Sequence, residues 1–110
     1  MLFDEPEIET GIKHWILDEN HKPVECNLMQ WGRFFEHAWK RRVAYTELDG
    51  ATVSTVFIGI NLDHFARGAP LLFETMVFGG ECTDEMERYA TWEEAIAGHE
   101  EIVMRVRAKL

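Results

Sequence analysis

The chain has 110 residues, and we expect residues 1–110 to form a single domain whose first 12 residues are an acidic lead-in. It carries 20 acidic and 11 basic residues, a formal net charge of -9. This excess of acids argues against direct binding of duplex DNA and against anionic membrane surfaces, because both need clustered Lys and Arg. With 46% hydrophobic and 12% aromatic residues, the chain has enough apolar side chains for a packed core.

The first residues, the cysteines and the histidines show no targeting or metal-binding motif. Residues 1–10 lack the basic and apolar regions of a signal peptide, and no apolar run reaches the roughly 18 residues that span a bilayer. Cys26 and Cys82 lie in no CxxC motif or Cys/His cluster, so we expect two reduced thiols. The five histidines show no close pairing, so we expect neither a metal nor a cofactor.

The first predicted element is a small N-terminal β-hairpin. A short apolar run at residues 14–17 precedes a polar stretch at 18–23 that is typical of a turn. Residues 24–26 then return as a second short strand.

A helix over residues 28–41 is predicted next. Asn27 is a good N-cap and Gln30 stands three residues later, as a capping box requires. Apolar residues recur at helical spacing as far as Trp39, which we therefore place on the buried stripe. The basic residues 40–42 suit the negative end of the helix dipole.

Strands follow at residues 43–48, 51–60 and 71–78, with a short edge strand at 88–90. Asp49-Gly50 between the first two strands predicts a two-residue hairpin with a type I′ turn. The loop between the second and third strands is longer and sets their register less firmly.

A second helix, over residues 92–108, completes the fold. Thr91 and Glu94 form a capping box, and apolar residues follow at helical spacing. The order of elements predicts an α+β, two-layer fold: an antiparallel β-meander with two helices packed on one face and an N-terminal β-hairpin.

Strand alternation sorts the sheet into two faces. The Asp-Gly turn pairs Tyr45 with Ser54 and Arg42 with Phe57, and we expect Phe57 to lie opposite Glu74. The predicted core face then carries Val43, Tyr45, Val56, Ile58, Ile60, Leu71, Phe73 and Val77. The predicted free face carries Arg42, Ala44, Thr46, Val53, Thr55, Phe57, Gly59, Leu72, Glu74, Met76 and Phe78.

The free face is the first candidate binding site. In this register Arg42, Phe57 and Glu74 form one row, with Thr55 and Met76 beside it. An aromatic ring between a guanidinium and a carboxylate can hold a planar, anionic, nucleotide-like ligand. A surface ion-pair row without a ligand, or a homodimer that covers the face, explains the pattern equally well.

Two histidines are secondary candidates. His99 lies on the buried stripe of the last helix, where a core histidine bonded to the backbone is favoured over a ligand or a base. His64 lies in a loop beside Asp63. Because no GxSxG, HExxH or Gly-rich phosphate loop occurs, the residues favour a binding protein over an enzyme.

One pattern runs through residues 15–20, 28–36, 53–59, 70–80 (PLLFETMVFGG) and 88–95, with Gly98 and His99. It resembles a family of small uncharacterised proteins that is widespread in tailed bacteriophages and prophages. The resemblance covers most of residues 14–107, and FETMVFGG is its most specific piece. The chain departs from the family pattern at His21 and at residues 66–69, which are turn positions where the family tends to have glycine.

The resemblance implies a phage-encoded protein made in the host bacterial cytoplasm, and it supplies no active-site residues that could be carried over to this chain. Small acidic phage proteins often counter host defence. We therefore expect an anti-defence accessory protein that sequesters a nucleotide-like ligand and forms a homodimer. One alternative is an acidic protein that blocks a host immune protein, like an anti-CRISPR protein or a nucleic-acid mimic, through the acids of residues 81–101. The other is a small structural or dimerisation protein with no ligand.

Overall fold

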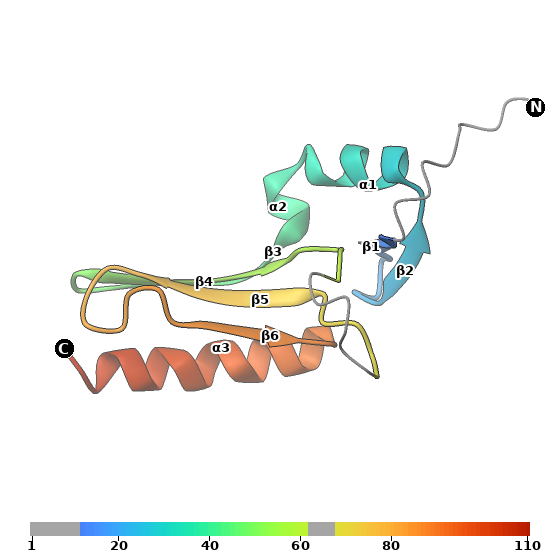
Figure 1. Cartoon of the computed structure of the whole chain (residues 1–110). Helices are drawn as coiled ribbons and strands as arrows, with labels where there is room; N and C mark the ends of the chain where they lie inside the picture. Colours follow the sequence, from blue (N-terminus) through green and yellow to red (C-terminus); the bar gives the residue numbers. More distant parts are fainter. Residues whose placement is uncertain (1–11, 62–67) are drawn as a thin grey trace, which may run out of the picture.

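The computed structural model describes residues 12–61 and 68–110. These residues form a two-stranded sheet, a four-stranded antiparallel sheet and three helices, so the predicted α+β fold is confirmed (Figure 1). The acidic lead-in lies outside the described residues except for residue 12. In chain order the elements are β1 (His14–Leu17), β2 (Pro23–Cys26), α1 (Leu28–Phe35), α2 (Ala38–Arg41), β3 (Arg42–Leu48), β4 (Ala51–Phe57), β5 (Phe73–Phe78), β6 (Met86–Tyr89) and α3 (Trp92–Arg107).

The predicted N-terminal hairpin is confirmed. β1 and β2 pair antiparallel, with Ile16 opposite Val24. Asp18 organises the turn, because its Oδ1 accepts hydrogen bonds from the backbone N–H groups of Asn20 and Lys22 at 2.8 and 2.9 Å. This arrangement is a typical role of aspartate in turns.

Two of the contacts that attach the hairpin to the rest of the molecule involve its first strand and its turn. The backbone N–H of Trp15 donates to the carbonyl oxygen of Gly59 at 2.8 Å. Gly59 has a φ of 67°, and a Cβ there would lie 2.5 Å from the Trp15 carbonyl oxygen, so only glycine fits. At the hairpin turn, the His21 ring stacks on Trp92 with 3.8 Å between the ring centroids.

The single helix predicted over residues 28–41 is wrong, because the structure has two short helices there. The capping box is present: Asn27 Oδ1 accepts from the Gln30 N–H at 2.8 Å, and Gln30 Oε1 accepts from the Asn27 N–H at 3.0 Å. His37 then adopts an extended conformation, with φ −107° and ψ 99°, and redirects the chain between α1 and α2. Trp39 therefore leaves the buried stripe and is 73% exposed.

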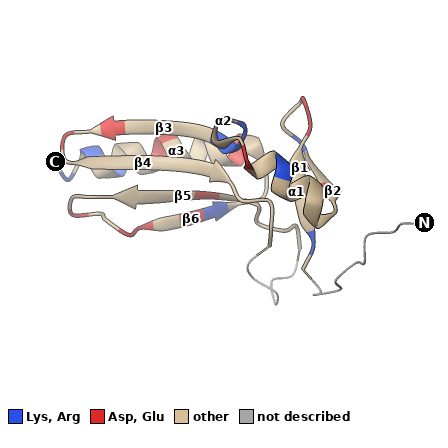
Figure 2. Cartoon of the chain, turned by 90° about the horizontal axis from the view of Figure 1, so that it is seen from above, with Lys and Arg blue, Asp and Glu red and all other residues tan. Residues whose placement is uncertain are grey.

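The four strands β3 to β6 form a meander in which sequence neighbours are also sheet neighbours (Figure 2). The predicted hairpin register is confirmed at the turn, where Leu48 pairs with Ala51. The predicted type I′ turn is wrong: Gly50 has a φ of 81°, whereas Asp49 is not among the described residues with positive φ. A type I′ turn needs positive φ at both positions.

Further along the sheet, the predicted register is wrong by one residue. A β-bulge between residues 42 and 44 places Arg42 opposite Val56 rather than Phe57. Phe57 pairs with Phe73, not with Glu74. Because side chains alternate between faces, this shift of one residue between β4 and β5 puts every side chain of β4 on the face opposite to the predicted one.

The buried face of the sheet, called the inner face below, packs against α3, which lies behind the strands in Figure 2. Its fully buried side chains are Val53, Thr55 and Phe57 of β4 and Phe73, Thr75 and Val77 of β5. The core assignment is confirmed for Phe73 and Val77 and is wrong for β4. It is also wrong for Tyr45, which is 45% exposed on the opposite, outer face.

The helices occupy two positions along the sheet. α3 contacts all four strands, and Figure 1 shows it running along one side of them. α1 and α2 lie at the end of the sheet near β1 and β2 (Figure 1). α1 still reaches the same core, because the rings of Phe34 and Phe35 contact Phe57.

The predicted start of α3 is confirmed. Thr91 Oγ1 accepts a hydrogen bond from the Glu94 N–H, and Glu94 Oε1 accepts one from the Thr91 N–H, both at 3.1 Å. In the middle of the helix, Gly98 lies against the ring of Tyr89, and a Cβ at Gly98 would lie 2.2 Å from a ring carbon. The glycine therefore allows the close packing of α3 on β6.

Candidate functional site

The five residues predicted to form a ligand site do not share one surface. Thr55 and Phe57 are fully buried on the inner face. Arg42, Glu74 and Met76 belong to the outer face, since Arg42 and Glu74 both pair with Val56, which alternates with these two buried residues. The predicted row is wrong because no aromatic ring stands between the guanidinium and the carboxylate.

The charged groups of that row have other partners. Glu74 Oε2 accepts from Arg88 Nε at 3.1 Å, and the two residues are paired across β5 and β6. The Arg42 guanidinium lies over the Tyr45 ring, 4.7 Å from its centroid. Glu74 is thus already neutralised by a cation, so this face does not offer the carboxylate that the predicted site required.

His99 is a core histidine, as favoured by the sequence, and is 4% exposed. Its partners are hydroxyls rather than backbone groups: Nε2 lies 2.8 Å from Thr46 Oγ1, and Nδ1 lies 2.7 Å from Thr55 Oγ1. Thr55 Oγ1 lies a further 2.5 Å from Thr75 Oγ1. Burial lowers the pKa of His99, which favours the neutral ring. A threonine hydroxyl lies against each of its two ring nitrogens. The second candidate, His64, lies outside the described residues.

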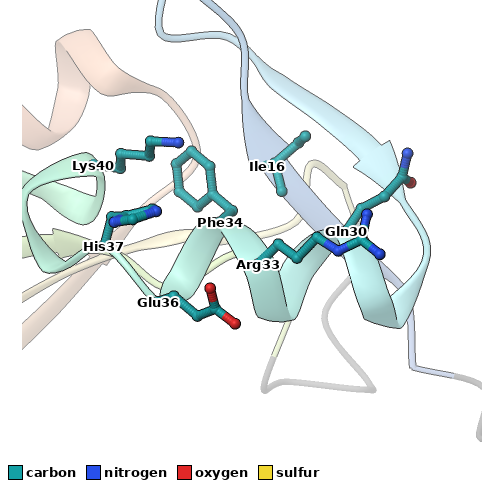
Figure 3. A pocket seen from close by; sticks show the side chains of 7 residues that line it. All are labelled: Ile16, Gln30, Arg33, Phe34, Glu36, His37 and Lys40. Atoms are coloured by element: carbon teal, nitrogen blue, oxygen red, sulfur yellow. The ribbon is translucent and has the colours of Figure 1, made fainter.

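A different part of the structure combines basic and aromatic side chains around a hollow. This solvent-open hollow of about 440 Å³ lies between β1 and the two short helices, and we call it the α1–α2 hollow (Figure 3). Three of its lining side chains can carry positive charge and one carries negative charge. The lining residues are Ile16, Gln30, Arg33, Phe34, Glu36, His37 and Lys40.

Cations lie over the aromatic rings of this region. Lys40 Nζ is 6.0 Å from the centroid of Phe34 and 5.5 Å from that of Trp39. Arg41 Cζ is 5.1 Å from the centroid of Phe35. These distances are in the range of cation–π attraction, which holds the flexible basic side chains against the rings.

Phe34 gives the hollow a fixed floor. Its ring meets the ring of Phe57 edge to face, with 5.8 Å between centroids and an interplanar angle of 82°. Phe57 is fully buried between β4 and the helices, so the position of Phe34 is set by the core. In Figure 3 the Phe34 ring lies in the middle of the view, with Lys40 on one side and Ile16 on the other.

The break between α1 and α2 produces this arrangement. A continuous helix would have kept Trp39 on the stripe that carries Phe35, but the extended backbone of His37 turns it into solvent. The His37 and Trp39 rings then lie 6.0 Å apart at the rim. The sequence patterns did not predict an exposed Trp39. The basic residues 40–42, which follow it directly, were the signal available for a surface role.

The hollow is positive in an acidic protein. Arg33 and Lys40 make no ion pair among the residues that the structure describes, and Glu36 is the one carboxylate in the lining. Figure 2 shows basic segments in α1 and α2, at the end of the sheet away from the β3–β4 turn. Unpaired cations beside exposed rings are suited to a ligand that is both anionic and planar.

A second, smaller hollow has the opposite character. It measures about 210 Å³ and is lined by Glu87, Tyr89, Gly98, Glu101, Ile102 and Arg105. Its one cation is engaged, because Arg105 Nη1 donates to Glu85 Oε1 at 2.7 Å. This hydrogen bond lowers the pKa of Glu85 and raises that of Arg105. The second hollow therefore has no free cation for an anionic ligand.

The two cysteines are both free. Burial raises the pKa of the Cys26 thiol, and a hydrogen bond with Glu85 raises that of Cys82, so both favour the unreactive protonated form. Within residues 12–61 and 68–110, no three His, Cys, Asp or Glu side chains lie together as a metal site. No helix in the described part of the chain is long and apolar enough to cross a membrane.

Comparisons with models of known protein families, with curated proteins and with solved structures found no match.

Proposed function

We propose that this protein binds and sequesters a small anionic, nucleotide-like ligand at the α1–α2 hollow. The observation that carries the proposal is the placement of Arg33, His37 and Lys40 around the Phe34 ring in a chain of net charge -9. Cations concentrated at one site of an acidic protein give that site a local attraction for anions that the rest of the surface lacks.

Each side chain has a role that its chemistry supports. Arg33 and Lys40 bind phosphate oxygens, the first through its planar fork and the second as a point charge. Trp39, which is exposed beside Lys40, stacks on a base or another planar group. Glu36 accepts a hydrogen bond from an exocyclic amine and so disfavours ligands without one.

The biological setting is part of the same proposal. The resemblance to phage and prophage proteins supports a phage-encoded accessory protein that works in the cytoplasm of the host bacterium. Binding without catalysis removes a nucleotide signal from solution, and removal of such a signal counters a host defence. The amount of protein, rather than a turnover rate, then limits the effect.

The test is a thermal-shift and calorimetry series with AMP, ATP, a cyclic dinucleotide and inorganic phosphate. Arg33→Ala and Lys40→Ala are each expected to weaken nucleotide binding about ten- to a hundredfold, because a charge-assisted contact contributes about 1.5–3 kcal/mol. Lys22→Ala, in the exposed turn of the β1–β2 hairpin, is the matched control and leaves binding unchanged. Trp39→Ala weakens nucleotide binding and leaves phosphate binding unaffected.

Two results would overturn the proposal. One is the absence of any shift in melting temperature by these probes at millimolar concentration. The other is equal binding by the parent and Lys40→Ala. Binding of phosphate alone, without discrimination by Trp39→Ala, would show an anion site but refute the nucleotide-like ligand.

The alternative function, an acidic protein that blocks a host immune protein, is favoured by a different surface. Carboxylates of β6 and α3, among them Glu87, Glu93 and Glu101, are exposed. Charge reversal at Asp84 and Glu87 would then slow association with a basic partner in a salt-dependent way, while Lys40→Ala would have no effect. The two variant sets therefore separate the two functions.

A further inference from the structure

The outer face of the four-stranded sheet carries three rows of side chains. The register of the strands defines these rows directly. Row one is Arg42, Val56, Glu74 and Arg88; row two is Tyr45, Ser54, Met76 and Met86; row three is Glu47, Thr52 and Phe78. Figure 2 looks onto this face, with α3 behind the strands.

Large apolar side chains are exposed in rows two and three. Tyr45 is 45% exposed, Met86 is 44% exposed and Phe78 is 55% exposed. Met76, which is half-buried, adjoins Met86 across the strands and Phe78 along β5, whereas Ser54 separates it from Tyr45. A contiguous apolar patch of this kind on a small protein is typical of an interaction surface.

The charges on this face lie in rows one and three. Row one carries Arg42 and row three carries Glu47, both on β3 and on either side of Tyr45. The Tyr45 hydroxyl lies 3.2 Å from Glu47 Oε1, which keeps this carboxylate on the outer face. The remaining charges of row one, Glu74 and Arg88, neutralise each other.

We propose that the outer face binds a second copy of this chain, with a two-fold axis along row two. This operation lays row one of each copy on row three of the other. Arg42 then faces the partner's Glu47, twice per dimer, and the apolar side chains of row two face their own counterparts. A two-fold axis along the strands would instead bring β3 onto the partner's β6 and set Arg42 against a second arginine, which is repulsive.

The ends of the sheet support the same orientation. The β3–β4 turn carries Asp49 at one end of the sheet, and α2 carries Lys40 and Arg41 at the other (Figure 2). An axis along row two reverses the strand direction of the second copy. The acidic turn of each copy therefore approaches the basic α2 of the other, so opposite charges also meet outside the three rows.

The test is sedimentation velocity of the full chain over a concentration series from micromolar to millimolar. The wild type is expected to form dimers. Arg42→Glu and Glu47→Arg are each expected to raise the dimer dissociation constant at least about tenfold, because each places like charges in contact twice. The double variant Arg42→Glu with Glu47→Arg restores the opposite-charge contact and returns the constant to within about threefold of the wild type.

Two further variants keep the test decisive. Met76→Lys puts a charge at the centre of row two and is expected to abolish dimers, with circular dichroism and the melting temperature checking the fold. Arg107→Glu, at the end of α3, is the matched charge control and leaves the constant unchanged. A wild type that is monomeric at every concentration overturns the proposal. A double variant whose dimer dissociation constant is no lower than that of either single variant overturns it as well. Because this orientation brings the partner's Asp49 toward Lys40, ligand binding at the α1–α2 hollow is tested separately through Arg33→Ala.

Discussion

Replacing Gly98 by alanine is expected to destabilise the protein, although the replacement improves helix propensity. Gly98 lies inside α3, where alanine is favoured over glycine by about 1 kcal/mol. The Cβ, however, would lie 2.2, 2.3 and 2.4 Å from three atoms of the Tyr89 side chain. The gain in helix propensity and the clash with Tyr89 therefore change the free energy of unfolding in opposite directions at this position.

The steric term is the larger one. The clash involves the outer ring atoms and the hydroxyl of Tyr89, so the ring has to move as a unit or α3 has to move away from β6. Forcing an extra carbon into a packed contact costs about 1–3 kcal/mol, and a separation this far below contact distance belongs at the upper end. After the helix gain is subtracted, we expect a net loss of about 1–2 kcal/mol, or roughly 5–10 °C in melting temperature.

Urea unfolding followed by circular dichroism measures this loss, and Gly32 supplies a matched control. Gly32 also lies inside a helix, α1, but a Cβ there would meet nothing within 4 Å. Gly32→Ala should therefore stabilise the protein by about 0.5–1 kcal/mol. Two Gly→Ala changes within helices should thus shift the free energy of unfolding in opposite directions.

A double-mutant cycle tests the assigned cause. In a Tyr89→Ala background the ring is absent, and Gly98→Ala should become stabilising by about 0.5–1 kcal/mol. The coupling between the two positions then amounts to about 2 kcal/mol. If Gly98→Ala is destabilising by the same amount with and without the ring, the packing of α3 against Tyr89 is not the reason for the glycine.

Three further predictions concern stability. Thr91→Ala removes one half of the α3 capping box and should cost about 1 kcal/mol in urea unfolding; an unchanged midpoint would show that the cap contributes nothing. Gly50→Ala should cost about 1 kcal/mol from backbone strain alone, since Gly50 has a φ of 81° and open space around it; an unchanged melting temperature would refute this. The folded protein lowers the pKa of His99 from its ordinary value of 6.5, so the unfolded chain binds the extra proton. The free energy of unfolding should be level above about pH 7 and fall as the pH drops below about 6.5, and His99→Gln should flatten this profile.

Local patterns in the sequence were sufficient to predict several elements. The capping boxes at Asn27 and Thr91 and the Asp-Gly turn each depend on residues within four positions of one another, and the structure contains all three. The exception is the turn type, because Asp49 does not take the positive φ that was assigned to it. Short-range signals thus place elements well even where they misassign a backbone angle.

The faces of the sheet could not be predicted in the same way. Along β4, β-branched residues stand on both faces: Val53 and Thr55 point inward, and Thr52 and Val56 alternate with them. Such a strand has no clear period of two, so its orientation has to come from pairing with β5. That pairing is set across the connection between Phe57 and Phe73, which is too long to fix a register by itself.

The candidate site in the structure differs from the predicted one for a related reason. Its exposed Trp39 depends on the extended backbone of His37, and nothing in the spacing of apolar residues indicates that break. The basic residues around it were visible in the sequence, but they are equally typical of the end of a helix. Only the folded chain shows Lys40 lying over the rings of Phe34 and Trp39 rather than extending into solvent.

The sequential order of β3 to β6 has a consequence for how the protein is made. Every pair of neighbouring strands is also consecutive in the chain, so the sheet can assemble strand by strand from contacts of short sequence separation, which favours rapid folding. The element that covers its inner face, α3, follows all four strands. During synthesis the Val53–Val77 surface, which packs against Ile102 and Val106 of α3, therefore stays uncovered until α3 has left the ribosome. In that interval it is a hydrophobic surface that chaperones can bind and that a second nascent chain can join.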